Sequence, residues 1–516
     1  LREATGYTNA YTFRNTLQYT GEYAGKHYIS LFAGQEIQER TAYNSFNYSP
    51  VFDEEHRIVG FPEMDGIDGS EINYNALGGT GKSVSKMSSF FANASYSYLD
   101  KYILTGALRY DGSDIIGNDN QFTPLWNVGL RWNLHREEFM KRWMWVDQFA
   151  VRGGFGYTGS IDKNALPFVV MTLGQSVIYD GQTVPTSFSY PNPNVKWQTK
   201  QDMNVGLDLS LFDYRLELGV NYYHNITRDV LDRKALPYSS GRSEVTENVA
   251  DIYNSGWEID LGVTLLKNKS FQWYAKANIA INDNKVKNTY YKDTEDLPRA
   301  TLSNAHQFVE NQPVNGWYGY KFAGINPING AVMTYTGNGE ATLDMSVSGA
   351  TWPTPSVFYL GNLTPPVVGG FSTSANWKQL IFSANFEFKT GHKIKSFNTF
   401  RSLDARNRHT SEANRWREPG DITNVPAMSE AFTTYSSYMY DILLEKGNYL
   451  RCSYMTLGYN LKPEWLHKIG FSTARLSFTA KNLFTISSYS GIDPALMGSF
   501  GYPNSRKYTI TLNVGF

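Results

Sequence analysis

The chain has 516 residues, with 47 Lys and Arg against 48 Asp and Glu, one cysteine and 15% aromatic side chains. A net charge near zero excludes a basic surface for polyanions, so no nucleic-acid partner is expected. The single Cys452 rules out an internal disulfide framework. No apolar run approaches the ~18 residues that a membrane-spanning helix needs, which excludes a helical membrane protein. A membrane β-barrel is not excluded, because only alternate residues of its strands face lipid.

Predicted strands follow one another along the chain, each with a period of two. The first is predicted near residues 8–20, and further alternating segments cover 126–132, 203–211, 216–222 and 257–265. In 203–211, for example, apolar side chains at odd positions oppose polar or small ones at even positions. This spacing is typical of strands with one apolar and one polar face. A soluble β-sandwich alternates as well, so the connections between strands must decide the class.

Short and long connections alternate along the chain. Tight turns are predicted near residues 100, 212–213, 267–270 and 377–379, and long polar connections at 40–86, 159–196, 229–251, 284–367, 392–447 and 487–506. Outer-membrane barrels have short periplasmic turns and long outer loops. About fifteen strands of ten or more residues are expected, with one short helical turn near 463–468. The predicted fold class is therefore all-β, a transmembrane antiparallel β-barrel.

The last predicted strand ends in an aromatic residue. Its apolar positions are Tyr508, Ile510, Leu512, Val514 and Phe516. An alternating final strand with a terminal aromatic side chain is interpreted as the signal that barrel-assembly machinery reads. The alternative is an ordinary edge strand.

The strand count predicts that the chain is part of a larger barrel. If the C-terminus is periplasmic, fifteen strands place the start of the chain on the outer side. Single-chain bacterial barrels have an even number of strands, and plugged transporters have about 22. We therefore expect residues 1–516 to be the C-terminal portion of such a barrel. About seven strands and the plug that fills a wide lumen would come from an N-terminal segment outside this chain.

Eight segments resemble, in order, the SusC/RagA family of TonB-dependent transporters from Bacteroidota. They are residues 101–113 (KYILTGALRYDGS), 151–159 (VRGGFGYTG), 197–231 (from Trp197 through GLDLSLFDYRLELGVNYYHNITRDVL), 316–325 (GWYGYKFAGI), 415–426 (RWREPGDITNVP), 447–461 (GNYLRCSYMTLGYNL), 481–494 (KNLFTISSYSGIDP) and 502–516. The sequence departs from the family at Gln198, where Glu is usual. It also departs at residues 336–344, where TGNGEATLD replaces an acidic loop and puts any cation site there in doubt.

The resemblance implies active import across the outer membrane of a Gram-negative bacterium. The ligand would be an oligosaccharide or a peptide, captured under a SusD-like surface lipoprotein lid. TonB would act on the plug through the N-terminal region. In this mechanism the barrel in the lipid bilayer is not an enzyme and uses no cofactor. One alternative is a passive porin-like or structural barrel without TonB coupling, and another is a secreted β-sandwich that is a carbohydrate-binding protein or an enzyme.

Several motifs that could indicate a nucleotide, metal or catalytic site are better explained by the structure of a barrel. Residues 76–83 (ALGGTGKS) resemble a phosphate-binding loop, but a predicted strand follows where that motif needs a helix, so flexible loop glycines are the better interpretation. The eight histidines are scattered, and no metal site is predicted. Polar residues assigned to the lumen face could be read as acid–base pairs, although a wet barrel interior explains them better; they include Asp208, Glu217, Asp260, Arg475 and Lys481.

Aromatic residues in the predicted outer loops are the candidates for substrate binding. They are Trp317, Tyr318, Tyr320, Trp352 and Trp416. Flat aromatic faces stack on sugar rings and bury peptide side chains. The same residue types also pack loops together and line membrane interfaces, and this alternative stays open.

Overall fold

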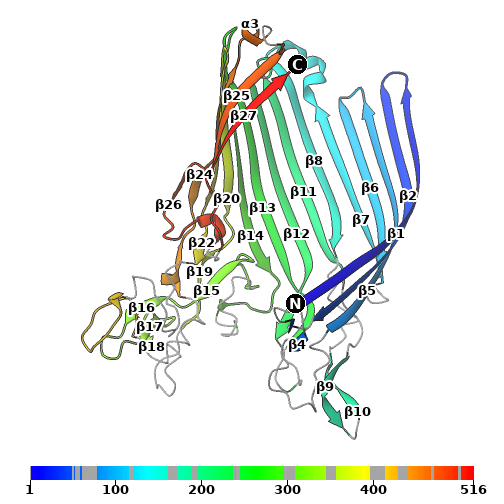
Figure 1. The fold of residues 1–516 in the computed structure, drawn as a ribbon. Coiled ribbons are helices and arrows are strands. Elements are labelled where there is room, and N and C mark those ends of the chain that lie inside the picture. Colours follow the sequence, from blue (N-terminus) through cyan, green and yellow to red (C-terminus); the bar gives the residue numbers. More distant parts are fainter. Residues whose placement is uncertain are drawn as a thin grey trace. The chain divides into compact units, whose positions relative to one another are not determined.

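The computed structural model describes most of the chain and is mainly β-structure (Figure 1). The described residues are 2–48, 51–52, 58–60, 78–114, 121–160, 171–179, 182–188, 196–235, 239, 244–294, 297, 308–343, 356–395, 413–427, 440–466, 470–497 and 501–516. They contain one 16-stranded sheet, in which strands that follow one another in sequence are hydrogen-bonded neighbours. This confirms the all-β antiparallel prediction.

Fifteen of these strands form a continuous path. They are β1 (Arg2–Tyr23), β2 (His27–Tyr48), β5 (Gly78–Tyr98), β6 (Tyr102–Ser113), β7 (Phe122–Asn133), β8 (Val146–Ser160), β11 (Gln198–Leu211), β12 (Leu216–Ala235), β13 (Glu244–Lys267), β14 (Phe271–Lys287), β20 (Val367–Trp377), β21 (Leu380–Thr390), β24 (Tyr449–Asn460), β25 (Thr473–Lys481) and β27 (Lys507–Gly515). The sixteenth, β26 (Thr485–Ser487), pairs with β24 beyond the end of β25. Strands β25 and β26 therefore form one interrupted crossing, and the predicted count of about fifteen is confirmed.

The smaller elements lie in the connections. Short strands are β3 (Val51–Phe52), β4 (Ile58–Gly60), β9 (Met171–Tyr179), β10 (Gln182–Phe188), β15 (Gly316–Gly319), β16 (Phe322–Ile325), β17 (Val332–Tyr335), β18 (Ala341–Leu343), β19 (Phe358–Asn362), β22 (Lys393–Lys395) and β23 (Leu444–Lys446). Helical turns are η2 (Leu134–Arg136), η3 (Glu138–Arg142), η8 (Asp441–Leu443), α3 (Pro463–Leu466) and η10 (Pro494–Leu496). Among the described residues, no helix has the length and apolar composition to cross a membrane.

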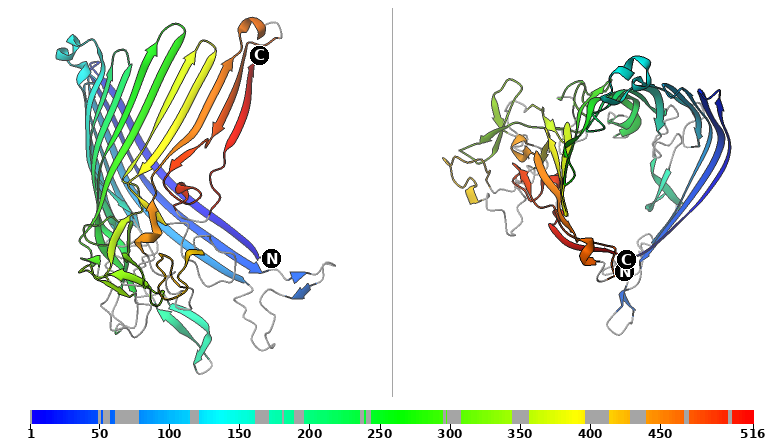
Figure 2. Two further views of the ribbon diagram at one scale, coloured as in Figure 1. Left: turned by 90° about the vertical axis from the view of Figure 1, so that its left-hand side faces the viewer. Right: turned by 90° about the horizontal axis from the view of Figure 1, so that it is seen from above.

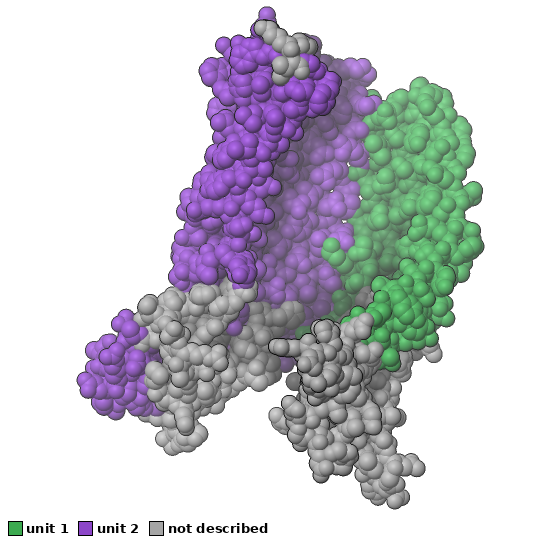
Figure 3. All heavy atoms as spheres, viewed as in Figure 1, with its two compact units in different colours: residues 1–130, 155–200, 231–248 green, residues 131–154, 201–230, 249–516 purple. Residues whose placement is uncertain are grey.

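The chain divides into two compact units, coloured separately in Figure 3. Unit 1 comprises residues 1–130, 155–200 and 231–248, and unit 2 comprises residues 131–154, 201–230 and 249–516. In unit 1, β1, β2, β5 and β6 pair in an unbroken antiparallel register. In unit 2, β20, β21, β24, β25 and β27 pair in this order as antiparallel neighbours, and they run side by side in yellow to red in the left view of Figure 2.

The tight turns fall where the sequence predicts them. Phe212, Asp213 and Tyr214 between β11 and β12 all have positive φ, and the Arg215 N–H closes the turn on the Leu211 carbonyl at 3.0 Å. The short turns between β5 and β6, β13 and β14, and β20 and β21 are also present. The predicted helical turn near 463–468 is the four-residue α3.

The strands of the first hairpins are longer than predicted. Strand β1 extends well past residues 8–20, β2 continues to Tyr48, and β5 already begins at Gly78. The connection predicted over 40–86 is therefore shorter at both ends, and the interpretation of the glycines at 78–81 as a flexible loop was wrong. The pairing continues through polar residues such as Asn44 opposite Gly81, where no apolar alternation marks a strand. A Cβ on Gly81 would lie 2.1 Å from the Asn44 Oδ1 atom, so glycine leaves room for that side chain.

One face of the sheet is apolar and exposed. In unit 2 a row of facing residues runs across β21, β24, β25 and β27 through Phe382, Leu457, Phe478 and Ile510. The last three side chains are 54%, 46% and 75% exposed. A continuous exposed apolar face of this kind is a lipid-facing surface. Strand β27 belongs to it, with Tyr508, Ile510 and Leu512 exposed, and Phe516 directly after the strand is exposed as well.

Candidate functional site

The opposite face of the sheet is polar and carries ordered charge networks. In unit 1, Arg14 of β1 forms an ion pair with Glu36 of β2. Arg109 of β6 lies 3.9 Å from the same Glu36 and 2.6 Å from Asp111, and it donates a hydrogen bond to Ser89 at 2.9 Å. Arg14, Glu36, Ser89 and Asp111 face one another in one row across β1, β2, β5 and β6, and Arg109 lies two residues from Asp111 on β6. This pairing satisfies the charges while leaving the Arg14 guanidinium accessible.

A hollow of about 390 Å³ lies beside this network. Its polar lining includes Arg14, Arg109 and Asn93, and its aromatic lining includes Phe32 and Phe91. The two phenyl rings are stacked with centroids 5.7 Å apart, and the Arg109 guanidinium lies 5.6 Å from the Phe91 centroid. Fixed cationic donors next to an aromatic surface can bind a carboxylate or a hydroxyl-bearing ligand.

Gly34 makes room for the aromatic lining. A Cβ at Gly34 would lie 2.6 Å from the tip of the Phe91 ring, so any larger residue would displace that ring. Arg14, Glu36, Phe32, Phe91 and Arg109 were not identified from the sequence. Strand alternation places each on the polar face, but the register that brings them together is set by pairing between strands.

Unit 2 has a second network on its polar face. Asp208 of β11 accepts a hydrogen bond from Arg131 at 3.0 Å and lies 3.5 Å from Arg152. Arg152 is within 3.5 Å of the Asn221 side-chain carbonyl, and Asn221 donates to Glu258 at 3.2 Å. These contacts extend from β7 to β13. These polar groups pair with one another from strand to strand, so the network has a structural role.

The other polar residues named from the sequence have similar local partners. Glu217 accepts from the Tyr274 hydroxyl at 3.5 Å, and Arg475 donates to Asn460 at 2.7 Å. Asp260 and Lys481 lie on β13 and at the end of β25. Within the described ranges, no three His, Cys, Asp or Glu side chains converge in a way that could hold a metal ion.

Three of the predicted loop aromatics lie in two hydrophobic clusters of unit 2. Tyr318 and Tyr320 are fully buried in one, whose buried members are Leu297, Val309, Tyr318, Tyr320, Ile325, Val332, Val357, Tyr440 and Leu443. Trp317 is buried in the other, against Leu360 and Leu444, and its indole N–H donates to the Lys393 carbonyl at 2.9 Å. Burial raises the pKa of the Tyr318 hydroxyl. In this conformation these three side chains hold the loops together.

Trp416 is the more accessible of the described candidates. Its ring is half-buried beneath Gly330, and its indole N–H donates to the Pro327 carbonyl at 3.1 Å. Trp352 lies outside the described residues. Substrate contact by these aromatic residues stays a prediction. The segment at residues 336–343, where the family has an acidic loop, forms the turn and second strand of the β17–β18 hairpin.

Two family-like motifs meet in a buried ion pair. Arg451 of β24 and Asp493 of the GIDP segment are 5% and 7% exposed, and their side chains are in direct contact. The Asp493 carboxylate also accepts hydrogen bonds from the N–H groups of Ala495 at 2.9 Å and Asn504 at 3.2 Å. The pair anchors the connection before β27 to the start of β24.

His392, just after β21, is a buried titratable group outside the membrane-spanning strands. It is 3% exposed, and its Nδ1 atom has no hydrogen-bond partner among the described residues. Burial, and then the nearby Lys389, lower the pKa of its imidazole. Gly447 lies against the ring, where a Cβ would be 2.4 Å from Nε2.

The exposed apolar face, the charged opposite face and the alternation of short turns with long loops define a transmembrane antiparallel β-barrel wall. The family model described as "TonB dependent receptor-like, beta-barrel" matches residues 2–387, well over half of the chain. The chain belongs to this family, and it is an outer-membrane protein.

Similar proteins cover more than this chain. The TonB-dependent receptor P3 of Formosa agariphila is 28% identical over an alignment of 539 positions. The alignment covers 97% of this chain and 52% of the relative. The TonB-dependent receptor SusC of Bacteroides thetaiotaomicron is 23% identical, over 83% of this chain and 43% of its own length. The structure of the RagAB peptide transporter matches with a TM-score of 0.79 at 24% identity, covering all of this chain and 56% of that one. The chain thus spans about half the length of the curated relatives it matches.

Proposed function

We propose that this chain forms part of the barrel wall of a TonB-dependent importer, which takes up an oligosaccharide or a peptide with a SusD-like surface lipoprotein. The observation that carries the proposal is a family barrel whose polar face presents organised charges while its apolar face meets lipid. In such an importer the polar face contacts the plug and the passing ligand. The similarity to SusC and to the RagAB peptide transporter supports the same class of activity.

The paired charges on the polar face suit a barrel wall that must release the ligand passing along it. Arg109 and Asp208 already have protein partners, so a ligand competes with existing contacts and is held weakly. Arg14 is also paired, with Glu36, but its side chain is 58% exposed, so it is the arginine of this network that is best placed to bind an anionic ligand. The loop clusters around Tyr318 and Trp317 give the outer loops a fixed shape on which a lipoprotein lid can close.

The experiment is mass spectrometry of the native complex, extracted in detergent from cells that express the intact protein. We expect a plug-bearing piece, a surface lipoprotein and a co-purified oligosaccharide or peptide. An Arg14→Gln variant should release more of an anionic ligand than a matched Lys276→Gln variant on the sheet of unit 2. Recovery of a barrel with neither plug nor lipoprotein would refute the proposal and leave a passive or structural barrel.

A further inference from the structure

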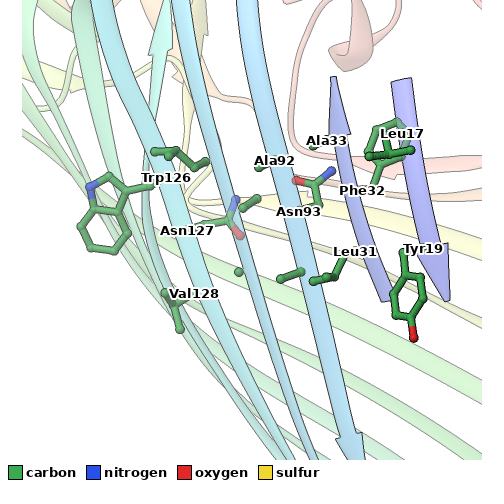
Figure 4. A pocket seen from close by; sticks show the side chains of 14 residues that line it. Leu17, Tyr19, Leu31, Phe32, Ala33, Ala92, Asn93, Trp126, Asn127 and Val128 are labelled. Carbon is green, nitrogen blue, oxygen red and sulfur yellow. The ribbon is translucent and has the colours of Figure 1, made fainter. Parts of the chain in front are cut away.

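A hollow of about 560 Å³ opens on the apolar face of unit 1 (Figure 4). Its floor is made of small residues on three neighbouring strands: Ala33 on β2, Ala92 and Ala94 on β5, and Gly106 on β6. It lies on the opposite face from the charge network of Arg14 and Glu36. Nothing in the proposed import function requires a cavity on this side of the wall.

The strand register creates the hollow. One row of facing residues reads Leu17, Ala33, Ala92, Leu108, and the next reads Tyr19, Leu31, Ala94, Gly106. Each row thus has two adjacent small residues, offset by one strand between the rows, with large side chains at the other positions. Since side chains stand perpendicular to a sheet, a patch of small residues among large ones leaves a depression.

The rim is held in place by ring packing. Trp126 lies at one side of the hollow, and Leu17 and Tyr19 lie at the other (Figure 4). The Trp126 ring contacts Phe155 and Tyr157, with centroids 5.8 and 5.5 Å away. The Tyr19 hydroxyl contacts that of Tyr23. The depression is therefore a preformed shape.

The surroundings identify the occupant. The hollow is continuous with the lipid-facing surface, where hydrocarbon is the solvent and an unfilled depression loses dispersion contacts. We propose that it holds one acyl chain of an outer-membrane lipid at a fixed position on the barrel. The chain would lie over Ala92 and Ala94, between the Trp126 ring and the side chains of Leu17 and Tyr19.

The lipid-facing surface of unit 2 supplies a matched control. Ala277 of β14 is also an exposed alanine on that face, opposite Leu261 and Phe371. It does not line this hollow, and Phe371 beside it is stacked on Phe386 with centroids 4.6 Å apart. An Ala277→Phe variant therefore adds the same bulk to the same kind of surface without filling the hollow.

The test uses the intact protein reconstituted with phosphatidylcholine whose acyl chains are brominated, because bromine quenches indole fluorescence on contact. The Trp126 signal is the difference between wild type and Trp126→Phe. We expect this signal to be quenched at a several-fold lower fraction of brominated lipid than the other tryptophans. Ala94→Phe should remove that preference, whereas Ala277→Phe should retain it. Native mass spectra should show one fewer retained lipid for Ala94→Phe alone.

Folding is checked by heat-modifiable migration on gels, and Ala92→Leu provides a second, smaller filling variant. Quenching of Trp126 at the same lipid fraction as the other tryptophans would overturn the proposal. So would retention of the same number of lipids by Ala94→Phe or, if that variant does not fold, by Ala92→Leu. A change of oligomeric state on filling, with no lipid lost, would show that a second copy of the chain occupies the hollow and would also overturn it.

Discussion

Replacing Asp493 by Ala removes the anionic partner of a buried arginine. Among the described residues, the Arg451 guanidinium keeps a hydrogen bond to the Thr485 hydroxyl at 3.1 Å, a 3.7 Å contact with Glu387, whose side chain is 46% exposed, and a position 5.2 Å from the centroid of the Tyr449 ring. The N–H groups of Ala495 and Asn504 lose their acceptor at the same time. The connection before β27 therefore loses its anchor.

The expected cost follows from the burial of both charges. Breaking a buried ion pair by removing one partner costs roughly 3–5 kcal/mol, because the remaining charge is uncompensated. Glu387 compensates in part, so we expect a value near the lower end, about 3 kcal/mol. Asp493→Asn retains an acceptor for the backbone N–H groups and should cost less. The double variant Arg451→Met, Asp493→Ala removes both charges and should be more stable than Asp493→Ala.

The measurement is urea unfolding in lipid vesicles, followed by tryptophan fluorescence, for wild type, Asp493→Ala, Asp493→Asn, Arg451→Met and the double variant. The double-mutant cycle separates the ion pair from the lost backbone contacts. If Asp493→Ala changes the free energy of unfolding by less than about 1 kcal/mol, the pair behaves as a solvent-exposed one and the reasoning is refuted.

Three further predictions concern the two faces and the loop histidine. Leu457→Arg on the apolar face should lower stability in vesicles by about 2–4 kcal/mol, whereas Ser477→Arg on the polar face should have little effect; equal losses would contradict the assignment of the faces. Because burial lowers the pKa of His392, the charged form is disfavoured in the folded state, so the loop should lose stability as pH falls below about 6.5. Hydrogen exchange between pH 7.5 and 5 should show this in wild type but not in His392→Gln. Gly34→Val should displace the Phe91 ring and weaken ligand retention by the native complex, and unchanged retention would remove the hollow beside Arg109 from the ligand path.

The sequence predicts the crossings better than the contacts between them. Alternation and turn residues locate most strands, because lipid on one face and water on the other impose a period of two. The ends of β2 and β5 were missed because their polar pairing beyond the apolar band carries no such pattern. Whether a loop tyrosine such as Tyr318 faces a ligand or packs inside a cluster depends on pairing between β15 and β19, some forty residues apart.

The charge networks of the candidate site were predicted least well, because they too depend on contacts between distant segments. Arg14 and Glu36 become partners only through register, and Arg451 meets Asp493 only when the connection before β27 folds back on β24. The resemblance marked the segments that contain Arg451 and Asp493. It did not indicate that the two form a buried pair.

The proposed energised import is tested most directly by uptake into cells that produce the intact protein. Wild-type and gene-disrupted cells are supplied with a defined mixture of oligopeptides and oligosaccharides, with and without a protonophore, and the medium is followed by mass spectrometry. We predict that wild-type cells deplete a subset of these compounds, and that gene disruption, loss of TonB or the protonophore each prevents it. Depletion that continues without TonB and without a proton gradient would contradict the account and indicate a passive barrel.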